Sequence, residues 1–309
     1  MGWWKRSSRQ LTGPLKSKHL YLPAAEVDHA SQNKMLTAPE PEHLFVMYFT
    51  PRSGSSWVAD IASRSKHFGQ VTETFNPRHM DKMTRACQAP DLDSYCKIFP
   101  RRMQRNGVLG FQVTHHQIAH VFGSDQAFLD RYGTAPAFWL IRQDIILQAI
   151  SLHKMVVTGF AHTPHTTASD RAAAEQAYHY KSKSIRDWLL HILVAEERTD
   201  AMFERAGITP MRMSYEQNTQ LTARQLLSIM SQHIGMPHVK VTRSFQTKHE
   251  LVRTARNHAI AERVREERAT YVKEIEDRRK WRLEQLAFYG PKRLRPDADT
   301  DPDHSGDAL

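Results

Sequence analysis

The sequence has few cysteines and lacks a long apolar run. Cys87 and Cys96 are the only cysteines among 309 residues, which argues against a disulfide-built fold and against a metal site made of several thiolates. The opening MGWWKRSSRQ is basic but is not followed by the apolar core of a secretion signal, and no stretch has the length of a membrane span. We therefore expect a cytoplasmic protein with reduced thiols and no transmembrane segment.

Acidic residues are fewer than basic ones, so the formal net charge at pH 7 is +10. Such an excess of Lys and Arg points to an anionic partner, but a nucleotide, a nucleic acid, a glycan and a membrane surface all satisfy it. The distribution is uneven, since the tail PDADTDPD is acidic and the first twenty residues are basic. The part between them is still basic.

Apolar runs alternate with helical patterns along the chain. Strands are expected at residues 43–49, 71–73, 108–114, 137–142 and 210–215, and helices at 55–66, 144–158, 174–206 and 223–234. This alternation predicts an α/β fold with three layers, in which a central parallel sheet is covered by helices on both faces. The first strand, the loop after it and the next helix form a unit that resembles a phosphate loop.

The composition divides the chain into four parts. We expect a flexible basic N-terminal arm over residues 1–41, the main domain over 42–265, a charged helix over 266–289 and a disordered acidic tail over 290–309. From residue 256 to 288 Arg, Glu and Lys dominate, with one thin apolar stripe at helical spacing. That pattern is typical of a solvated helix that packs on the body or on a partner subunit, so a homodimer is one interpretation.

The serine-rich loop, residues 50–57, joins the first expected strand to the first helix and reads TPRSGSSW. Such a junction gathers backbone N–H groups and the positive end of a helix around one point, which suits an anion. The loop lacks the second glycine and the lysine of G-x-x-x-x-G-K-[ST], which argues against conventional ATP or GTP hydrolysis. Arg52 instead offers a forked donor for two phosphate or sulfate oxygens.

Four further segments follow in a matching order: GQVTETFN at 69–76, VLGF at 108–111, the stretch from Arg142-Gln143-Asp144 through QAIS to Thr158, and the stretch from AGITP to SYE at 206–216. With the serine-rich loop they make this sequence resemble the sulfotransferases that use 3′-phosphoadenylyl sulfate (PAPS), and most closely the bacterial trehalose 2-sulfotransferase family. The resemblance covers roughly residues 43 to 265. It implies PAPS as donor, no metal, and a carbohydrate or glycolipid-type hydroxyl as acceptor.

The resemblance also implies roles for particular residues. The 5′-phosphosulfate of PAPS would be bound by Pro51, Arg52, Ser53, Gly54, Ser55, Ser56 and Trp57. Arg142 and Ser151 would hold the 3′-phosphate, and the end of a parallel strand, where Arg142 stands, is where such sheets gather ligand groups. Arg256, with Lys248 and Arg253, stands where sulfotransferases close a basic loop over the nucleotide; a solvated charge run is the alternative.

Sulfuryl transfer needs donors at the leaving phosphate oxygen and a base at the acceptor hydroxyl. Arg52 is the candidate donor. Glu73 corresponds to the carboxylate base of the similar family, and His115 is the rival base because Val113-Thr114-His115 resembles the strand end of animal cytosolic sulfotransferases. Two departures, Gln112 in place of Lys and Phe111 in place of Gly, indicate that the contacts near the acceptor differ.

Other interpretations remain open at this point. His116 and His120 have the spacing of a metal-binding helix, but no third ligand is identifiable. The loop around His162 and His165 suits either an acceptor pocket or a lid.

Two alternative functions are open: a nucleotide-dependent kinase of the phosphate-loop superfamily, and a basic nucleic-acid-binding protein. The missing loop lysine argues against the kinase, and the lack of a motif that reads bases argues against the nucleic-acid-binding protein.

Overall fold

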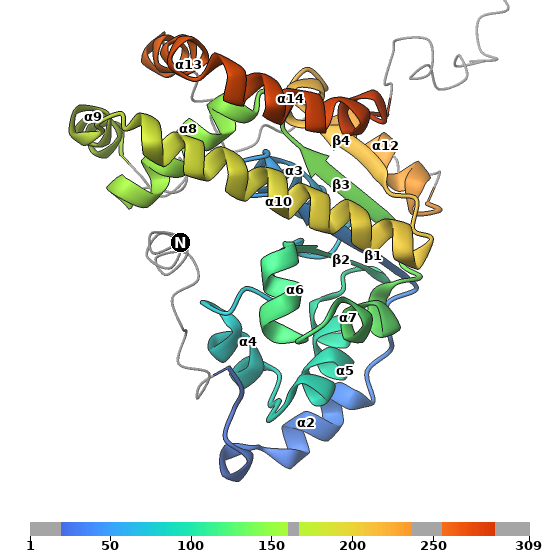
Figure 1. Ribbon diagram of the computed structural model, residues 1–309. Coiled ribbons are helices and arrows are strands. Elements are labelled where there is room, and N and C mark those ends of the chain that lie inside the picture. Colours follow the sequence, from blue (N-terminus) through green and yellow to red (C-terminus); the bar gives the residue numbers. More distant parts are fainter. Residues whose placement is uncertain (1–19, 160–166, 237–254, 288–309) are drawn as a thin grey trace, which may run out of the picture.

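The computed structural model describes residues 20–159, 167–236 and 255–287 (Figure 1). At its centre lies a parallel sheet of four strands in the order β2-β1-β3-β4. The strands are β1 (His43–Phe49), β2 (Val108–Val113), β3 (Ala137–Ile141) and β4 (Met211–Ser214). The predicted α/β class with a central parallel sheet is confirmed.

Helices cover both faces of this sheet (Figure 1). They are η2 (Ala24–Glu26), α2 (His29–Leu36), α3 (Ser55–Arg64), α4 (Met80–Ala86), α5 (Leu92–Met103), α6 (His115–Val121), α7 (Asp125–Tyr132), α8 (Ile145–Thr158), α9 (Ala168–Ala177), α10 (Ser182–Ala206), α11 (Tyr215–Asn218), α12 (Ala223–His233), α13 (Ala255–Glu267) and α14 (Ala269–Glu284).

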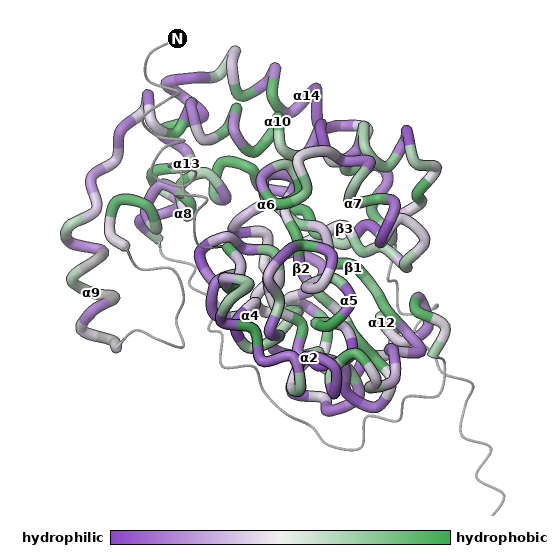
Figure 2. The backbone as a smooth tube through the Cα atoms, turned by 90° about the horizontal axis from the view of Figure 1, so that it is seen from below, coloured by the Kyte–Doolittle hydropathy of each residue, from purple (hydrophilic) through white to green (hydrophobic). Residues whose placement is uncertain are grey.

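Side chains along the strands alternate between two cores, as the twofold period of a strand requires. On β1, Phe45 and Met47 pack with α3 and α12, whereas Val46 and Tyr48 pack with α5, α7 and the end of α10. A third apolar cluster joins α8, α10, α13 and α14 beside the sheet. Figure 2 shows the apolar residues concentrated along the central strands. Every strand is therefore anchored from both sides, which fixes where its carboxyl end lies.

Two strands approach closely at Gly110, which is paired in register with Phe45. A Cβ at residue 110 would lie 2.0 Å from Cζ of the Phe45 ring. Glycine is required here because the ring lies over the neighbouring strand, where any side chain would collide with it. The glycine of VLGF therefore serves the packing of β1 against β2.

The segment at residues 71–73 differs from its prediction as a strand. It makes one parallel bridge, Thr72 to Phe111, in which the Gln112 N–H donates to the Thr72 carbonyl over 2.8 Å. The chain then turns at once, because the Thr74 N–H donates back to the Thr72 carbonyl. The bridge is nonetheless enough to hold Glu73 beside the carboxyl end of β2.

Two predicted long helices are each two helices. The pattern at residues 174–206 belongs to α9 and α10, which are separated at 178–181, where the Tyr178 side chain is buried. The pattern at 256–288 belongs to α13 and α14. Most residues of α14 are exposed, and its thin buried stripe contains two arginines as well as the apolar Val272 and Ile275. Arg279 and Arg282 on α14 are among the most buried side chains described, at 1% and 3% exposure.

Part of the expected N-terminal arm has regular structure. From residue 20 onward this range contains η2 and α2, and α2 packs against α5. The Arg101 guanidinium on α5 donates to the Ala38 carbonyl over 3.1 Å. The rest of the arm, the acidic tail, the loop with His162 and His165, and Lys248 and Arg253 lie outside the described residues. Within the described ranges, no helix is both long and apolar enough to cross a membrane.

Candidate active site

The serine-rich loop follows the carboxyl end of β1 and leads directly into α3. Gly54 is the residue before the helix, has φ of +85°, and provides no side-chain cap. The first N–H groups of an α-helix have no acceptor within the helix, so the start of α3 is free to bind an anion. Ser53 supports this use, because its buried Oγ has no hydrogen-bond partner among the described residues.

Tyr215, at the end of β4, lies against this loop. A Cβ on Gly54 would lie 2.6 Å from Cδ2 of the Tyr215 ring. The same ring supports the guanidinium of Arg142, whose Cζ lies 4.7 Å from the ring centroid. Tyr215 therefore connects the serine-rich loop to the end of β3, and the connection requires a residue without a side chain at position 54.

The structure brings Arg52, Arg142 and Ser151 together. Arg52 Nε donates to Ser151 Oγ over 2.9 Å, and Arg142 Nη1 approaches the Arg52 carbonyl oxygen at 3.5 Å. Burial and, next, the positive charge of Arg142 lower the pKa of Arg52 to about 10. Two arginines held close in a partly buried place favour an anion between or beside them.

The turn from β3 to α8, residues 142–144, is held in a fixed conformation. The Gln143 and Asp144 N–H groups donate to the two oxygens of Glu216, over 2.8 and 3.3 Å. Asp144 also caps α8 by accepting from the Leu147 N–H over 2.8 Å. Arg142, 13% exposed, therefore projects from a turn that is tied down on both sides.

Two residues on α8, Gln148 and Lys154, lie near the group formed by Arg52, Arg142 and Ser151 and were not among the predicted site residues. Gln148 is buried and donates from Nε2 to Thr50 Oγ1 over 2.8 Å and to the Pro51 carbonyl over 2.9 Å. Lys154 lies one turn beyond Ser151 and forms an ion pair with Glu175. Burial lowers the pKa of Lys154, and the charges of Arg256 and Arg52 lower it further. Lys154 is a third cation near the loop, detectable in the sequence only by its spacing from Ser151.

Glu73 has the setting of an oriented carboxylate. Its Oε2 accepts from Asn76 Nδ2 and from Gln117 Nε2, each over 2.8 Å. Gln117 lies in the first turn of α6, directly after the carboxyl end of β2. Both bonds end on one oxygen, and among the described residues none is made to Oε1. That geometry fixes the carboxylate and leaves one oxygen to accept a proton.

His115 has a different set of partners. Its Nε2 lies 3.2 Å from Asp125 Oδ1 on α7, and Asp125 also pairs with Arg205 at the end of α10. Burial lowers the pKa of His115, against the opposing effect of Asp125. The imidazole is thus engaged with α7, whereas Glu73 is held by Asn76 and by the start of α6.

The remaining residues that the sequence predicted for a binding or metal site, Trp57, Arg256 and His116, lie in different parts of the structure. Trp57 is partly buried: its backbone N–H donates to the Gly54 carbonyl over 3.0 Å, and its ring packs against the core cluster that includes α3. Arg256 donates to the carbonyls of Glu175 and Tyr178 between α9 and α10. His116 stacks on His191 of α10 with ring centroids 4.8 Å apart. Among the described residues, no three His, Cys, Asp or Glu side chains form a group that could hold a metal.

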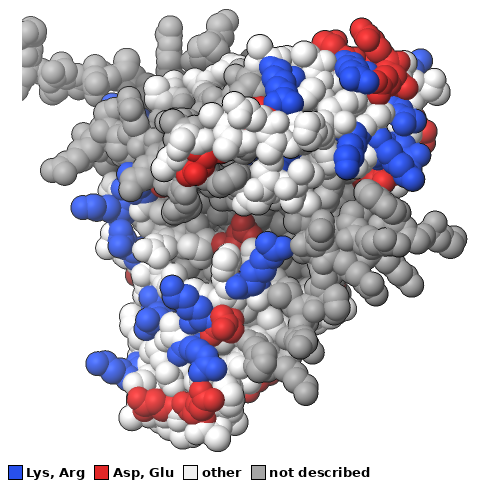
Figure 3. All heavy atoms as spheres, turned by 90° about the vertical axis from the view of Figure 1, so that its left-hand side faces the viewer, with Lys and Arg blue, Asp and Glu red and all other residues white. Residues whose placement is uncertain are grey.

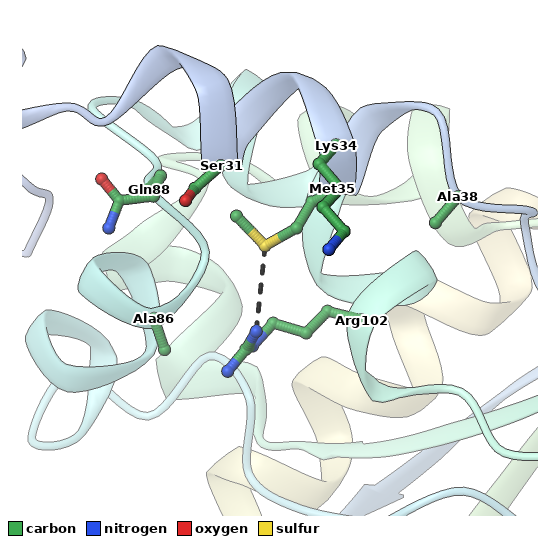
Figure 4. A pocket seen from close by; sticks show the side chains of 7 residues that line it. All are labelled: Ser31, Lys34, Met35, Ala38, Ala86, Gln88 and Arg102. Carbon is green, nitrogen blue, oxygen red and sulfur yellow. Dashed lines mark hydrogen bonds between the residues drawn. The ribbon is translucent and has the colours of Figure 1, made fainter.

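Outside this site, one cavity of about 500 Å³ lies beside α2 (Figure 4). It is lined by Lys34 and Met35 of α2, Arg102 of α5 and four smaller or neutral side chains. The Arg102 guanidinium points at Met35 Sδ, 3.9 Å away. None of the loop, strand-end or α8 residues described above lines this cavity.

The surface charge on the face in Figure 3 is mixed. Over the described residues drawn there, Lys and Arg side chains are interspersed with Asp and Glu. A nucleic-acid-binding face would present a continuous basic stripe. The described residues on this face do not form such a stripe.

A protein-family model described as Stf0 sulphotransferase matches residues 38–267. No curated protein matches the chain. The matched range includes the serine-rich loop, Glu73, Arg142 and Ser151, and it ends at α13, so α14 lies beyond it.

Proposed function

Since the chain belongs to the Stf0 sulfotransferase family, the trehalose 2-sulfotransferase family, and is therefore an enzyme of sulfuryl transfer, we propose that its donor is PAPS and that the anion site around the serine-rich loop binds it. Bound PAPS would supply the sulfuryl group and leave as adenosine 3′,5′-bisphosphate. The observation that carries this proposal is the pairing of Arg52 with Ser151 beside Arg142.

PAPS has two separate anionic groups on one nucleoside, and the site offers two places for them. The uncapped start of α3, with Ser53, Ser55, Ser56 and Arg52, suits the 5′-phosphosulfate. Arg142 and Ser151 suit the 3′-phosphate, because they come from the neighbouring strand end and from the helix after it. Arg52 touches Ser151 and so lies between the two places.

Arg52 has a catalytic role in this proposal as well as a binding role. As the bond between sulfur and the bridging phosphate oxygen breaks, negative charge grows on that oxygen. A guanidinium that is already held by Ser151 needs no reorganisation to stabilise this charge. Lys154 adds a second positive charge one helical turn away.

We assign Glu73 as the general base. The acceptor hydroxyl oxygen forms its bond to sulfur while its proton passes to Oε1 of Glu73, because Oε2 is occupied by Asn76 and Gln117. His115 is the second candidate. It is favoured less because Asp125 takes its Nε2 and the remaining nitrogen, Nδ1, is buried away from solvent.

The acceptor is proposed to be a hydroxyl of a carbohydrate or a glycolipid. The groups fixed near Glu73 are the side-chain amides of Asn76 and Gln117, and Gln112 on β2 has a buried Oε1 without a partner among the described residues. Neutral amides bind sugar hydroxyls as donors and as acceptors. A kinase reaction is not favoured, because the loop has no lysine in the position that holds the β- and γ-phosphates.

Label transfer tests this function. Purified protein is incubated with PAPS carrying radioactive sulfur and with a cell extract, and the labelled products are separated by class. We expect label in a glycan or glycolipid fraction with the wild type and a loss of at least about a hundredfold in initial rate with Glu73→Gln, which retains donor binding. Label only in other products would contradict the acceptor class. Full transfer by Glu73→Gln together with loss in His115→Ala would assign the base to His115.

A further inference from the structure

Helix α14 lies outside the matched family range, yet it contacts the candidate active site through one side chain. Arg279 is 1% exposed and donates from Nη2 to the Arg142 carbonyl over 2.6 Å and from Nη1 to the Gln143 carbonyl over 2.9 Å. These two carbonyls belong to the turn from which Arg142 projects. Figure 1 shows α14 lying along α10 beside the sheet.

The opposite side of the Arg279 guanidinium is fixed by α10. Its Nε and Nη2 donate to the two oxygens of Glu196, over 2.8 and 3.0 Å, and Glu196 is 0% exposed. The planar fork thus joins a buried carboxylate on one edge to two backbone carbonyls on the other. Only arginine has donors in that arrangement, because a lysine carries all of its N–H groups on one nitrogen.

The charges in this buried network do not cancel, because it holds three guanidinium groups and two carboxylates. Arg212, Arg279 and Arg282 share two carboxylates, Glu196 and Asp200. Arg212 and Arg282 both reach Asp200, and Arg282 also reaches Glu196. Arg279 could therefore be absent without leaving either carboxylate unpaired. Its remaining partners are the carbonyls of the turn.

The turn is held by a second carboxylate from the other side. Glu216 accepts from the Gln143 and Asp144 N–H groups, while Arg279 donates to the Arg142 and Gln143 carbonyls. Opposed bonds to N–H and C=O groups fix the peptide planes of a turn and therefore the direction of the side chain that leaves it.

We propose that Arg279 is a positioning residue for Arg142, so that α14 sets the selectivity of the donor site for a nucleotide with a 3′-phosphate. This inference rests on the proposed function, in which Arg142 binds that phosphate. It assigns to the C-terminal helix a specific part in donor recognition.

The test compares two nucleotides that differ only in the 3′-phosphate. Dissociation constants for adenosine 3′,5′-bisphosphate and for AMP are measured by calorimetry on the full chain, and their ratio gives the selectivity. With Arg279→Lys, which keeps the charge and removes the fork, we expect the selectivity to fall by about tenfold while the AMP affinity changes by less than about twofold. Arg282→Lys is the matched control, because Arg282 is similarly buried on α14 but, among the described residues, bonds only to Asp200 and Glu196.

An unchanged selectivity in Arg279→Lys, or an equal fall in both variants, would overturn the inference. If Arg279→Lys does not unfold cooperatively, Arg279→Met replaces it, since Glu196 keeps Arg282 as its partner there, and the same outcomes apply. A wild type that does not prefer the bisphosphate over AMP would instead contradict the proposed donor. The two failures are thus distinguishable.

Discussion

Gly54 restrains the shape of the proposed donor site. It has positive φ, and its missing side chain leaves room for Tyr215, which supports Arg142. Gly54→Ala should cost about 2–3 kcal/mol of unfolding free energy, from the left-handed backbone and the contact with the ring. The affinity for adenosine 3′,5′-bisphosphate should fall by about tenfold or more, because a displaced ring no longer supports Arg142.

Gly207→Ala is the matched control for this substitution. Gly207 also has positive φ, at +64°, but a Cβ there would have no atom within 4 Å. It should lose about 1 kcal/mol of stability and retain nucleotide affinity. Urea unfolding and calorimetry measure both quantities. Equal nucleotide binding by the two variants would contradict the role given to Tyr215.

Arg52 and Arg142 are anion-binding candidates in the sequence, and the structure brings them together with Ser151. A serine-rich loop after a strand, and an arginine at a strand end, are local patterns that indicate anion binding. Gln117 and Lys154 were not predicted, because what brings them to the site is the docking of α6 and α8, which no local pattern reports. Trp57 lies in the matching motif, but its side chain packs against the core cluster that includes α3.

At the scale of elements, α14 is bound to α10 through Glu196. This carboxylate is 0% exposed and pairs with both Arg279 and Arg282. Glu196→Ala leaves the buried guanidinium of Arg279 without a carboxylate, while Arg282 keeps Asp200, and should lower the free energy of unfolding by about 3–5 kcal/mol. Chemical denaturation measures the loss.

The neighbouring residue provides the control. Glu197 pairs with Arg278 on the same two helices, but both side chains are more than a third exposed. Glu197→Ala should therefore cost less than about 1 kcal/mol. A comparable loss in the two variants would mean that the buried network does not hold α14 in place.

Two segments, 256–288 and 71–73, show why hydrophobic periodicity alone does not predict the secondary structure and the burial of side chains. The charged stretch at 256–288 predicts a solvated helix with one thin apolar stripe, and this prediction counts arginine among the surface residues and not as part of that stripe. The two most buried arginines there are satisfied by Glu196, Asp200 and backbone carbonyls from distant parts of the chain. Likewise the 71–73 segment has strand residues but only one bridge, because the chain turns directly after it.

At the scale of the whole molecule, three imidazoles, one buried and two half-buried, make stability depend on pH. Burial lowers the pKa of His116, His153 and His191 to about 4. The unfolded chain takes up these protons near pH 6.5, whereas the folded protein excludes them until about pH 4. Stability is therefore fully present above pH 6.5 and is lost as the pH falls toward 4, by about 3 kcal/mol for each imidazole.

His191→Phe keeps a ring against His116 and removes one of these groups. The difference in unfolding free energy between pH 7.5 and pH 4.5 should be smaller in this variant by about 2–3 kcal/mol. His120→Gln is the control, since His120 is exposed on the same helix as His116. An acid loss identical in wild type and His191→Phe would contradict the half-buried, uncharged state of this imidazole.

We infer that the molecule binds a nucleotide with phosphates at both the 3′ and 5′ positions, without needing a metal. Calorimetric titration of the wild type with adenosine 3′,5′-bisphosphate and, separately, with ATP and Mg²⁺ measures this preference. We predict saturable binding of the bisphosphate in the presence of a chelator, at least about tenfold tighter than ATP with Mg²⁺, and its loss in Arg52→Ala. Tighter binding of ATP with Mg²⁺, or no binding of the bisphosphate, would contradict the account.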